Sequence, residues 1–281
     1  PNKNYELIQN QLKKKKFFWF EKKISDENYE KIMMLGDKSI QAEEKLSRVY
    51  PQKNLFSHII GQIDDDNFGI SGLEKSLDEN LKNNKNQIQL TVDKDIQFLI
   101  REDLLKYNKI FRAKGSAAIL MNVNTGEIIS LISLPDFNPN KRVNITDVNY
   151  INRATKGVYE LGSVFKTFTL AAGFHEGVIE PNTEFKDLEK SIRCGKNTIN
   201  EYDKKIPSSL TAEQILIRSG NIGSVRIARK IGIQKHKSFL RSIGILDQIE
   251  FDIEEVSQPS LIRWEEKCKL ETVAYGHGIN T

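Results

Sequence analysis

A serine and a lysine stand three residues apart near the start of the segment YELGSVFKTFTLAAGF, which runs from Tyr159 to Phe174. The residues that follow Gly162 are mostly apolar, small or aromatic, and this pattern predicts a buried helix. Because residues three apart share a helix face, the amine of Lys166 can reach the hydroxyl of Ser163. Burial lowers the pKa of a lysine, and such an amine can take the proton of a serine nucleophile. The spacing therefore predicts a nucleophile and its general base, whereas a lysine that snorkels to solvent is the plainer alternative.

A second polar group lies in the segment RSGNIGS, where Ser219 and Asn221 flank a glycine between two predicted helices. Side chains on such a tight loop can project toward a neighbouring site. Taken alone, the pattern favours the end of one helix followed by the N-cap of the next. Combined with Ser163 and Lys166, it favours a catalytic role. In that role the hydroxyl passes protons and the amide orients a substrate carbonyl.

These side chains must be positioned by the elements around them. The run Ile88–Asp93 is typical of a strand that ends in an N-cap, and a helix with apolar residues at helical spacing follows it. Two β-rich runs flank the sequence NTG within residues 116–135, which predicts a hairpin with a positive φ at the glycine. Thr211 and Gln214 form the pattern of a capping box, and a helix is expected to begin near Asn221. A hairpin between helical blocks favours an α+β fold.

The bulk composition describes an ordinary globular chain of 281 residues, with 38% hydrophobic and 28% charged residues. The net charge of +4 is spread along the chain, so it does not indicate a nucleic-acid partner. No apolar run is long enough to span a membrane. Cys194 and Cys268 have no metal-ligand spacing and could pair only if the fold brings them together. His58 and His277 have no partner spacing for a metal, and His277 is expected to be a loop or packing residue. No metal or other cofactor is expected.

The first ninety or so residues are polar and charged, and glycines punctuate short strands and turns, which predicts a separate, irregular region. Its sharpest basic cluster, Lys13–Lys16, precedes four aromatic residues at positions 17–20. One interpretation is a patch that binds a membrane surface. The interpretation that we favour is the solvated end of a strand or helix whose apolar half is buried.

The motifs together resemble those of the penicillin-binding proteins, whose active sites combine S-x-x-K, an S-x-N type element and K-T-G. YELGSVFKTFT is similar to the family's nucleophile block YEPGSxxKxxT, with Leu161 where proline is common, and SGN is similar to its S-x-N element. RVYPQKNLFSHIIGQ and GISGLEKSLDENL resemble N-terminal blocks of the class B enzymes. GSAAILMNVNTGEIISLISLPDFNPN and AYGHGIN resemble parts of their transpeptidase domain. Within class B, the closer resemblance is to the septal, cell-division D,D-transpeptidase.

The resemblance implies an α+β transpeptidase domain of the penicillin-binding and serine β-lactamase type over residues 88–281, with an antiparallel sheet and helices. It also implies an irregular N-terminal pedestal over residues 1–87. One departure is large, because no K-T-G, K-S-G or R-T-G triplet occurs in the chain. In the family this motif and the last strands of the sheet lie further along, while a membrane anchor precedes the pedestal. We therefore expect an excerpt of a longer enzyme, or a truncated product, that turns over poorly by itself.

Carried across residue by residue, the resemblance makes Ser163 the acylated nucleophile and Lys166 its general base. Ser219 would be a proton relay, and Asn221 would bind a substrate amide or an antibiotic side chain. The reaction implied is attack on the D-Ala–D-Ala bond of a peptidoglycan stem peptide, followed by transfer of the acyl group to an amine of a neighbouring strand. β-Lactams would acylate the same serine.

The resemblance also implies a single N-terminal anchor in the cell membrane, outside these residues, and a catalytic domain on the periplasmic side. The partners implied are peptidoglycan stem peptides, β-lactams, a membrane glycosyltransferase and division proteins. Two alternatives stay open. A serine β-lactamase shares S-x-x-K but needs a positioned water for deacylation. A penicillin sensor or scaffold domain would bind without turnover.

Overall fold

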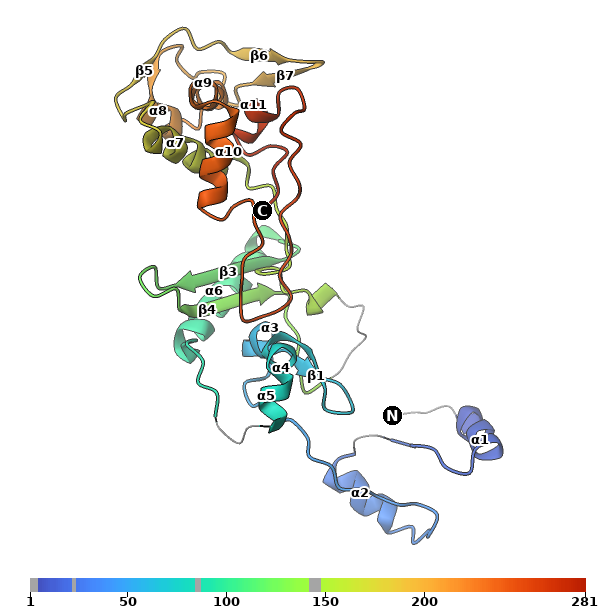
Figure 1. The fold of residues 1–281 in the computed structure, drawn as a ribbon. Helices are drawn as coiled ribbons and strands as arrows, with labels where there is room; N and C mark the ends of the chain where they lie inside the picture. Colours follow the sequence, from blue (N-terminus) through green and yellow to red (C-terminus); the bar gives the residue numbers. More distant parts are fainter. Residues whose placement is uncertain (1–4, 22–23, 84–86, 142–147) are drawn as a thin grey trace.

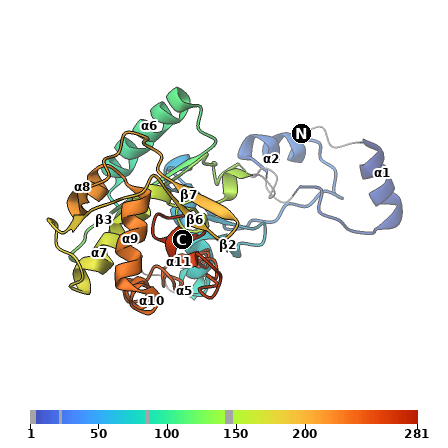
Figure 2. The ribbon, with the colours of Figure 1, turned by 90° about the horizontal axis from the view of Figure 1, so that it is seen from above.

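The computed structural model describes residues 5–21, 24–83, 87–141 and 148–281. Two N-terminal helices, α1 (Tyr5–Lys14) and α2 (Asp26–Met33), stand apart from the rest in both ribbon views (Figures 1 and 2). Of the aromatic residues after the lysine cluster, Phe17, Trp19 and Phe20 are exposed, at 67%, 55% and 50%. We expected the apolar half of this segment to be buried. That expectation is wrong for the described residues, because the segment lies outside the hydrophobic clusters that they form.

Residues 50–83, which we call the pedestal after the sequence prediction, form short helices and a two-stranded sheet. Its elements are η1 (Lys53–Phe56), α3 (Ser57–Ile60), β1 (Gln62–Ile63), β2 (Gly69–Ser71), α4 (Gly72–Ser76) and α5 (Asp78–Asn83). Gly61 and Gly72 lie so close together that a Cβ atom on Gly72 would come within 2.6 Å of the Gly61 amide nitrogen. Arg48 pairs with the buried carboxylate of Glu74 at 2.8 Å. These short elements agree with the irregular region predicted from the sequence.

A helix and a hairpin lie above the pedestal in Figure 1: α6 (Lys94–Phe111), β3 (Ser116–Met121) and β4 (Ile128–Leu134). The predicted N-cap is confirmed, since Asp93 accepts bonds from two backbone amides of the first turn of α6. The predicted antiparallel hairpin and the positive φ of Gly126 are confirmed as well. The strand predicted at Ile88–Asp93 is wrong. That segment joins β4 through only a side-chain bond from Thr91 and a backbone bond from Asp93, without forming a ladder.

In the C-terminal block, residues 148–281, short 3₁₀ helices come before the longer helices of the core. Its elements are η2 (Val148–Tyr150), η3 (Gly162–Phe165), α7 (Lys166–His175), β5 (Glu184–Phe185), β6 (Ser191–Cys194), β7 (Asn197–Asn200), β8 (Leu210–Thr211), α8 (Ala212–Ile217), α9 (Asn221–Ile231), α10 (Ile233–Ser242) and α11 (Lys269–Val273). β5 pairs with β8 and β6 with β7, all antiparallel. The capping box of Thr211 and Gln214 and the helix start at Asn221 are confirmed.

The core of this block lies between α7, α8, α9 and the two small sheets. Helix α7 packs against both α9 and α10. One cluster of buried apolar side chains joins these elements, and it includes Leu170, Ile215, Ile222, Val225 and Ile227. On α9, Ile222, Val225, Ala228 and Ile231 are buried and lie three residues apart, along one face of the helix. The buried face of α7 is thus fixed by contacts on two sides, which matters for the lysine at its first position.

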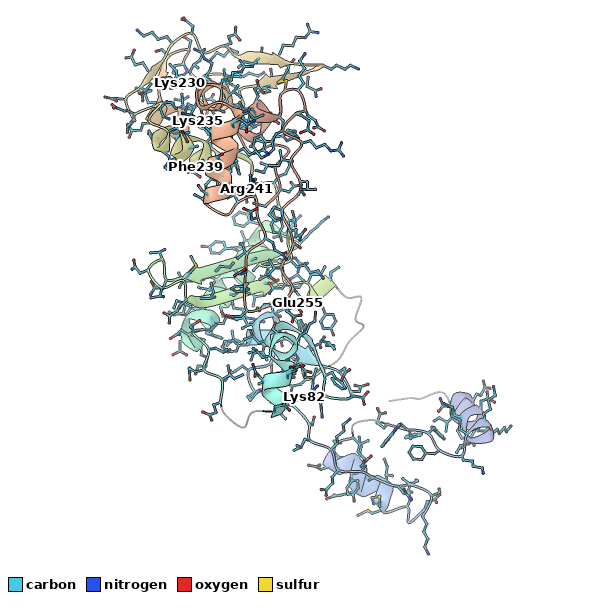
Figure 3. The ribbon with its side chains drawn as sticks, in the orientation of Figure 1. Lys82, Lys230, Lys235, Phe239, Arg241 and Glu255 are labelled. Atoms are coloured by element: carbon cyan, nitrogen blue, oxygen red, sulfur yellow. A yellow bond between two sulfur atoms is a disulfide. The ribbon has the colours of Figure 1, made fainter. Side chains whose placement is uncertain are left out.

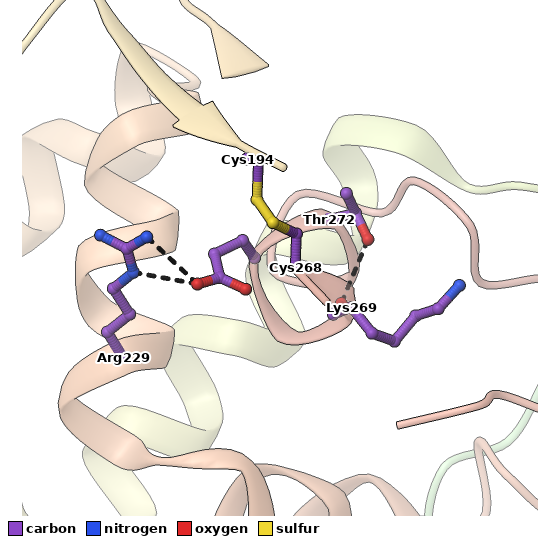
Figure 4. The surroundings of a disulfide bond; sticks show 6 residues. Cys194, Arg229, Cys268, Lys269 and Thr272 are labelled. Atoms are coloured by element: carbon purple, nitrogen blue, oxygen red, sulfur yellow. Dashed lines mark hydrogen bonds and ion pairs between the residues drawn. A yellow bond between two sulfur atoms is a disulfide. The ribbon is translucent and has the colours of Figure 1, made fainter. Parts of the chain in front are cut away.

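A disulfide bond between Cys194 and Cys268 links the β6–β7 hairpin to the N-terminus of α11 (Figure 4). The Cα atoms lie 5.7 Å apart. Beside the disulfide, the Glu271 carboxylate pairs with Arg229 of α9 at 3.1 Å. The pairing that the sequence left open is therefore present in the structure. Disulfides are typical of proteins outside the reducing cytosol.

One long loop connects the C-terminal block to the pedestal, and Glu255 lies on it where it reaches the pedestal (Figure 3). Both oxygens of Glu255 accept the amide of Gly72, at 2.9 and 3.2 Å. The Ser76 hydroxyl donates to the backbone oxygen of Gly72 and accepts the amide of Glu254, both at 3.1 Å. Among the described residues, no helix is both long and apolar enough to cross a membrane.

Candidate active site

The predicted nucleophile lies in a tight turn rather than inside the helix. Gly162 has a φ of 56°, a conformation that favours glycine, and it begins the short 3₁₀ helix η3, which contains Ser163. Ser163 is exposed, and α7 begins three residues later at Lys166. Helix α7 is not buried on all sides, since Phe174 is 42% exposed. The turn therefore presents the serine to solvent while the next residues enter the core.

Lys166 is 1% exposed and lies on the buried face of α7. Its amine donates hydrogen bonds to the backbone oxygen of Ser219 at 2.5 Å and to the Ser219 hydroxyl oxygen at 3.0 Å. Burial lowers its pKa to about 8, although the negative charge of Glu201 opposes that shift. An amine with this pKa is neutral in a substantial fraction of molecules near neutral pH, as a general base requires.

The direct partner of Lys166 differs from the one that the spacing predicts. Both hydrogen bonds of the amine go to Ser219, which is distant in sequence, and not to Ser163 one turn earlier. The snorkelling alternative is wrong, because the amine is buried in the protein. The structure thus brings the two sequence motifs together through their lysine and serine.

The Ser219–Asn221 turn joins α8 to α9. The amides of Ser219 and Gly220 bond back to carbonyls of α8, and α9 begins at Asn221. The plainer interpretation is correct in that one helix ends and the next begins here, but the N-cap is Gly220 and not Asn221. Ser219 has a φ of 52°, a left-handed conformation that is costly for a residue with a side chain. Such strain is found where a side chain must be held at a functional site.

The amide of Asn221 is held by the neighbouring hairpin. Its Nδ2 atom donates to the backbone oxygen of Asn200, the last residue of β7, at 2.8 Å. That bond fixes the orientation of the side chain, with its nitrogen toward β7. The amide oxygen then faces away from that bond, where a donor from a ligand can approach.

A glutamate that sequence reasoning missed completes this side of the site. Glu201 accepts the backbone amides of Asn221 and Ile222 at 2.7 and 2.8 Å, one on each carboxylate oxygen. Its charge is also the one that acts on the Lys166 amine. Glu201 lies in the polar stretch NEYDKK, where nothing in the local pattern distinguishes it from solvated residues.

The last residues of the chain pack against the nucleophile turn. A Cβ atom on Gly276 would lie 2.0 Å from the Gly162 carbonyl oxygen, so only glycine allows this approach. Glu160 accepts the amide of Gly278 at 2.8 Å, and the backbones of Tyr159 and Thr281 exchange two hydrogen bonds. The AYGHGIN block therefore forms one wall beside Ser163.

His277 has the loop position expected of it. His277 is stacked on Tyr275 and lies 3.7 Å from the Glu160 carboxylate. His58 is buried, and its ring nitrogen lies 2.8 Å from the backbone oxygen of Asn149. In the described ranges, the group of possible metal ligands that lie close together is the disulfide pair with Glu271. Two sulfurs that are bonded to each other are not thiolate ligands.

Comparison with known families agrees with this arrangement. The model of the penicillin-binding protein transpeptidase domain matches residues 116–281, and the model of the penicillin-binding protein dimerisation domain matches residues 2–104. The first match alone spans more than half of the chain. The chain therefore belongs to the penicillin-binding proteins, and its fold is the α+β fold of their transpeptidase domain.

Individual relatives point the same way. The chain is 30% identical over 253 residues to the probable peptidoglycan D,D-transpeptidase FtsI of Caulobacter vibrioides, covering 89% of this chain and 43% of that protein. It is 26% identical over 307 residues to the probable peptidoglycan D,D-transpeptidase PenA of Neisseria meningitidis serogroup A, covering 98% of this chain and 52% of that protein. The chain thus spans about half the length of these curated relatives.

A solved structure supports the fold. Penicillin-binding protein 3 of Mycobacterium tuberculosis, crystallised in complex with aztreonam, superposes with a TM-score of 0.75 at 22% identity, covering 84% of this chain and 55% of that one. At this identity the likeness concerns the fold alone. The predicted fold class and family are confirmed by these comparisons.

Proposed function

We propose that the protein to which this chain belongs is a peptidoglycan D,D-transpeptidase of cell division, which cross-links stem peptides through an acyl-enzyme on Ser163. The observation that carries this proposal is the buried amine of Lys166, which has a lowered pKa, bonds Ser219 and lies three residues after an exposed serine. Family membership and the names of the relatives support the reaction class.

In the acylation step, the Ser163 hydroxyl oxygen attacks the carbonyl carbon of the penultimate D-alanine. The neutral amine of Lys166 takes the hydroxyl proton, so the nucleophile is not a free alkoxide. The C–N bond to the last D-alanine breaks, and the leaving amine receives a proton that passes through the Ser219 hydroxyl. The Asn221 amide binds the peptide backbone of the substrate. An amine of a second strand then takes the acyl group from Ser163.

β-Lactams are cyclic amides, and in this proposal they acylate the same serine. The aztreonam complex of the mycobacterial protein of the same fold is consistent with this. We also propose that residues 88–281 belong to the transpeptidase domain and residues 1–87 to the pedestal. The cell-surface substrate requires that the domain face the periplasm or the outer surface, anchored at the membrane. A membrane glycosyltransferase and division proteins are the proposed partners.

Labelling with a fluorescent penicillin tests the proposal in the whole natural protein that carries these residues. We expect one covalent label per molecule, located at Ser163 by peptide mapping. Ser163→Ala should abolish it, and Thr167→Ala, an exposed residue one position beyond the lysine, should retain it. No label, or a label elsewhere, contradicts the proposal. Rapid hydrolysis of nitrocefin would instead indicate a β-lactamase.

A further inference from the structure

Glu201 binds the first turn of α9 with both carboxylate oxygens. The amides of Asn221 and Ile222 are among the four at a helix start that have no partner within the helix. Glu201 satisfies both, at 2.7 and 2.8 Å, and its negative charge lies at the positive end of the helix. It is therefore tied to the Ser219–Asn221 turn by two charge-assisted bonds.

The negative charge of the same carboxylate acts on the Lys166 amine, and both groups bond the segment that holds the Ser219–Asn221 turn. Two arginines, one at the end of α8 and one on α9, pair with other carboxylates. Arg218 pairs with Asp203 at 2.6 Å, and Arg229 pairs with Glu271. On α10, which packs against α7, burial lowers the pKa of His236 to about 4, so this imidazole is neutral near pH 7. Its Nε2 atom lies 3.4 Å from the hydroxyl of Thr169, on the helix that carries Lys166.

We propose that Glu201 is a positioning residue for the reaction at Ser163. Its carboxylate holds the Ser219–Asn221 turn against the Lys166 amine and supplies the negative charge that acts on this amine. This inference rests on the proposed function and deepens it. A merely structural helix cap would hold the turn in place but would not influence the proton equilibrium of the lysine.

The test compares Glu201→Gln with the wild type in the whole natural protein. The rate of Ser163 acylation by a fluorescent penicillin is measured from pH 5.5 to pH 10. Without the negative charge, the ammonium form of Lys166 loses stabilisation, so the midpoint of the acidic limb should move to lower pH. The plateau rate should fall by about tenfold, because glutamine can accept only one of the two amide bonds and the turn shifts.

Two matched variants separate charge from position. Glu201→Asp keeps the charge on a shorter arm, so its midpoint should stay near that of the wild type while its plateau rate falls. Glu213→Gln removes a carboxylate from the exposed surface of α8 and should leave both midpoint and plateau unchanged. An unchanged midpoint in Glu201→Gln overturns the inference, whatever happens to its thermal stability. If Glu201→Gln does not fold, the inference is overturned instead by a shift of one pH unit or more in the midpoint of Glu201→Asp.

A direct titration keeps this inference distinct from the proposed function. The Lys166 amine can be followed by NMR through its Cε carbon in labelled wild type and in Glu201→Gln, without any acylation. A lower lysine pKa in the variant supports the role of Glu201, and equal values overturn it. Absence of acylation in the wild type would overturn the proposed function, and the titration would still decide whether Glu201 acts on Lys166.

Discussion

At the scale of single residues, the candidate site depends on a lysine whose side chain is buried in the core. A charged amine is costly in such a place, and Lys166 keeps it only through two bonds to Ser219 and the charge of Glu201. Ser219 in turn is held in a left-handed conformation. An apolar residue at position 166 or a glycine at position 219 would be the more stable choice. We therefore attribute Lys166 and Ser219 to the proposed reaction rather than to stability.

A pair of substitutions at Ser219 tests this conclusion. Ser219→Ala removes the hydroxyl that accepts a bond from the buried Lys166 amine and keeps the left-handed strain, so the free energy of unfolding should fall by about 1–3 kcal/mol. Ser219→Gly loses the same bond but relieves the backbone, so it should be about 1 kcal/mol more stable than the alanine variant. Both variants should lose about 100-fold in the rate of acylation. Urea unfolding and penicillin labelling measure the two effects, and a glycine variant less stable than the alanine variant would contradict the account.

At the scale of elements, the site is assembled from pieces that are tied together at their outer ends. The β6–β7 hairpin leads directly to Glu201, and its other end is joined by the disulfide to α11. Helix α11 leads in turn to the wall that packs on Gly162. The disulfide therefore connects the element beside Asn221 with the element beside the nucleophile turn.

Removing the disulfide should cost stability. The two cysteines are 74 residues apart, so the bond closes a long loop and restricts the unfolded chain. The double variant Cys194→Ala, Cys268→Ala should lose roughly 2–5 kcal/mol of unfolding free energy under oxidising conditions. With a strong reductant present, wild type and variant should become similar. Equal stability of the two proteins without reductant would show that the bond does not form in solution.

Local sequence patterns predicted the elements whose signals are short range. The N-cap Asp93, the hairpin turn at Gly126 and the capping box at Thr211 all involve neighbours within a few residues. The strand at Ile88–Asp93 failed because a strand also needs a partner ladder, which the apolar run itself cannot specify. Glu201 was missed for the same reason, since its partners at 221 and 222 are distant in sequence.

The residues of the candidate site could be proposed from the sequence, but their contacts could not. Ser163, Lys166, Ser219 and Asn221 were predicted as site residues from their spacing and from resemblance to a family, and their catalytic roles stay a proposal. Their spacing suggested that the lysine bonds the serine one turn earlier, whereas both of its hydrogen bonds go to the second motif. Which polar groups meet across a site depends on how helices α7, α8 and α9 pack, and that packing is a property of the whole core.

At the scale of the whole molecule, a loop from the C-terminal block is attached to the pedestal. Glu255 binds the buried amide of Gly72 with both oxygens, and Lys75 pairs with Glu254 at 3.1 Å. The contact between Glu255 and Gly72 is partly buried, whereas both side chains of the Lys75–Glu254 ion pair are about half exposed. The position of the pedestal relative to the site should therefore depend on Glu255 far more than on its neighbour.

Two adjacent glutamates provide a matched test of this attachment. Glu255→Ala leaves the Gly72 amide without its charged acceptor and should cost about 1–3 kcal/mol of unfolding free energy. Glu254→Ala removes an exposed ion pair and should cost less than about 1 kcal/mol. Thermal and urea unfolding would measure both. The attachment is unimportant if the Glu255 variant loses no more stability than the Glu254 variant.

The most direct test of the whole account is the pH dependence of Ser163 acylation in the whole natural protein. Only the neutral amine can accept the serine proton, and burial lowers the pKa of Lys166 to about 8. The rate should therefore be low near pH 6, rise with pH and level off above about pH 9, with a midpoint near 8. A rate that is independent of pH across this range, or one that rises only near the ordinary lysine pKa of about 10.4, would contradict the assignment of Lys166 as the base.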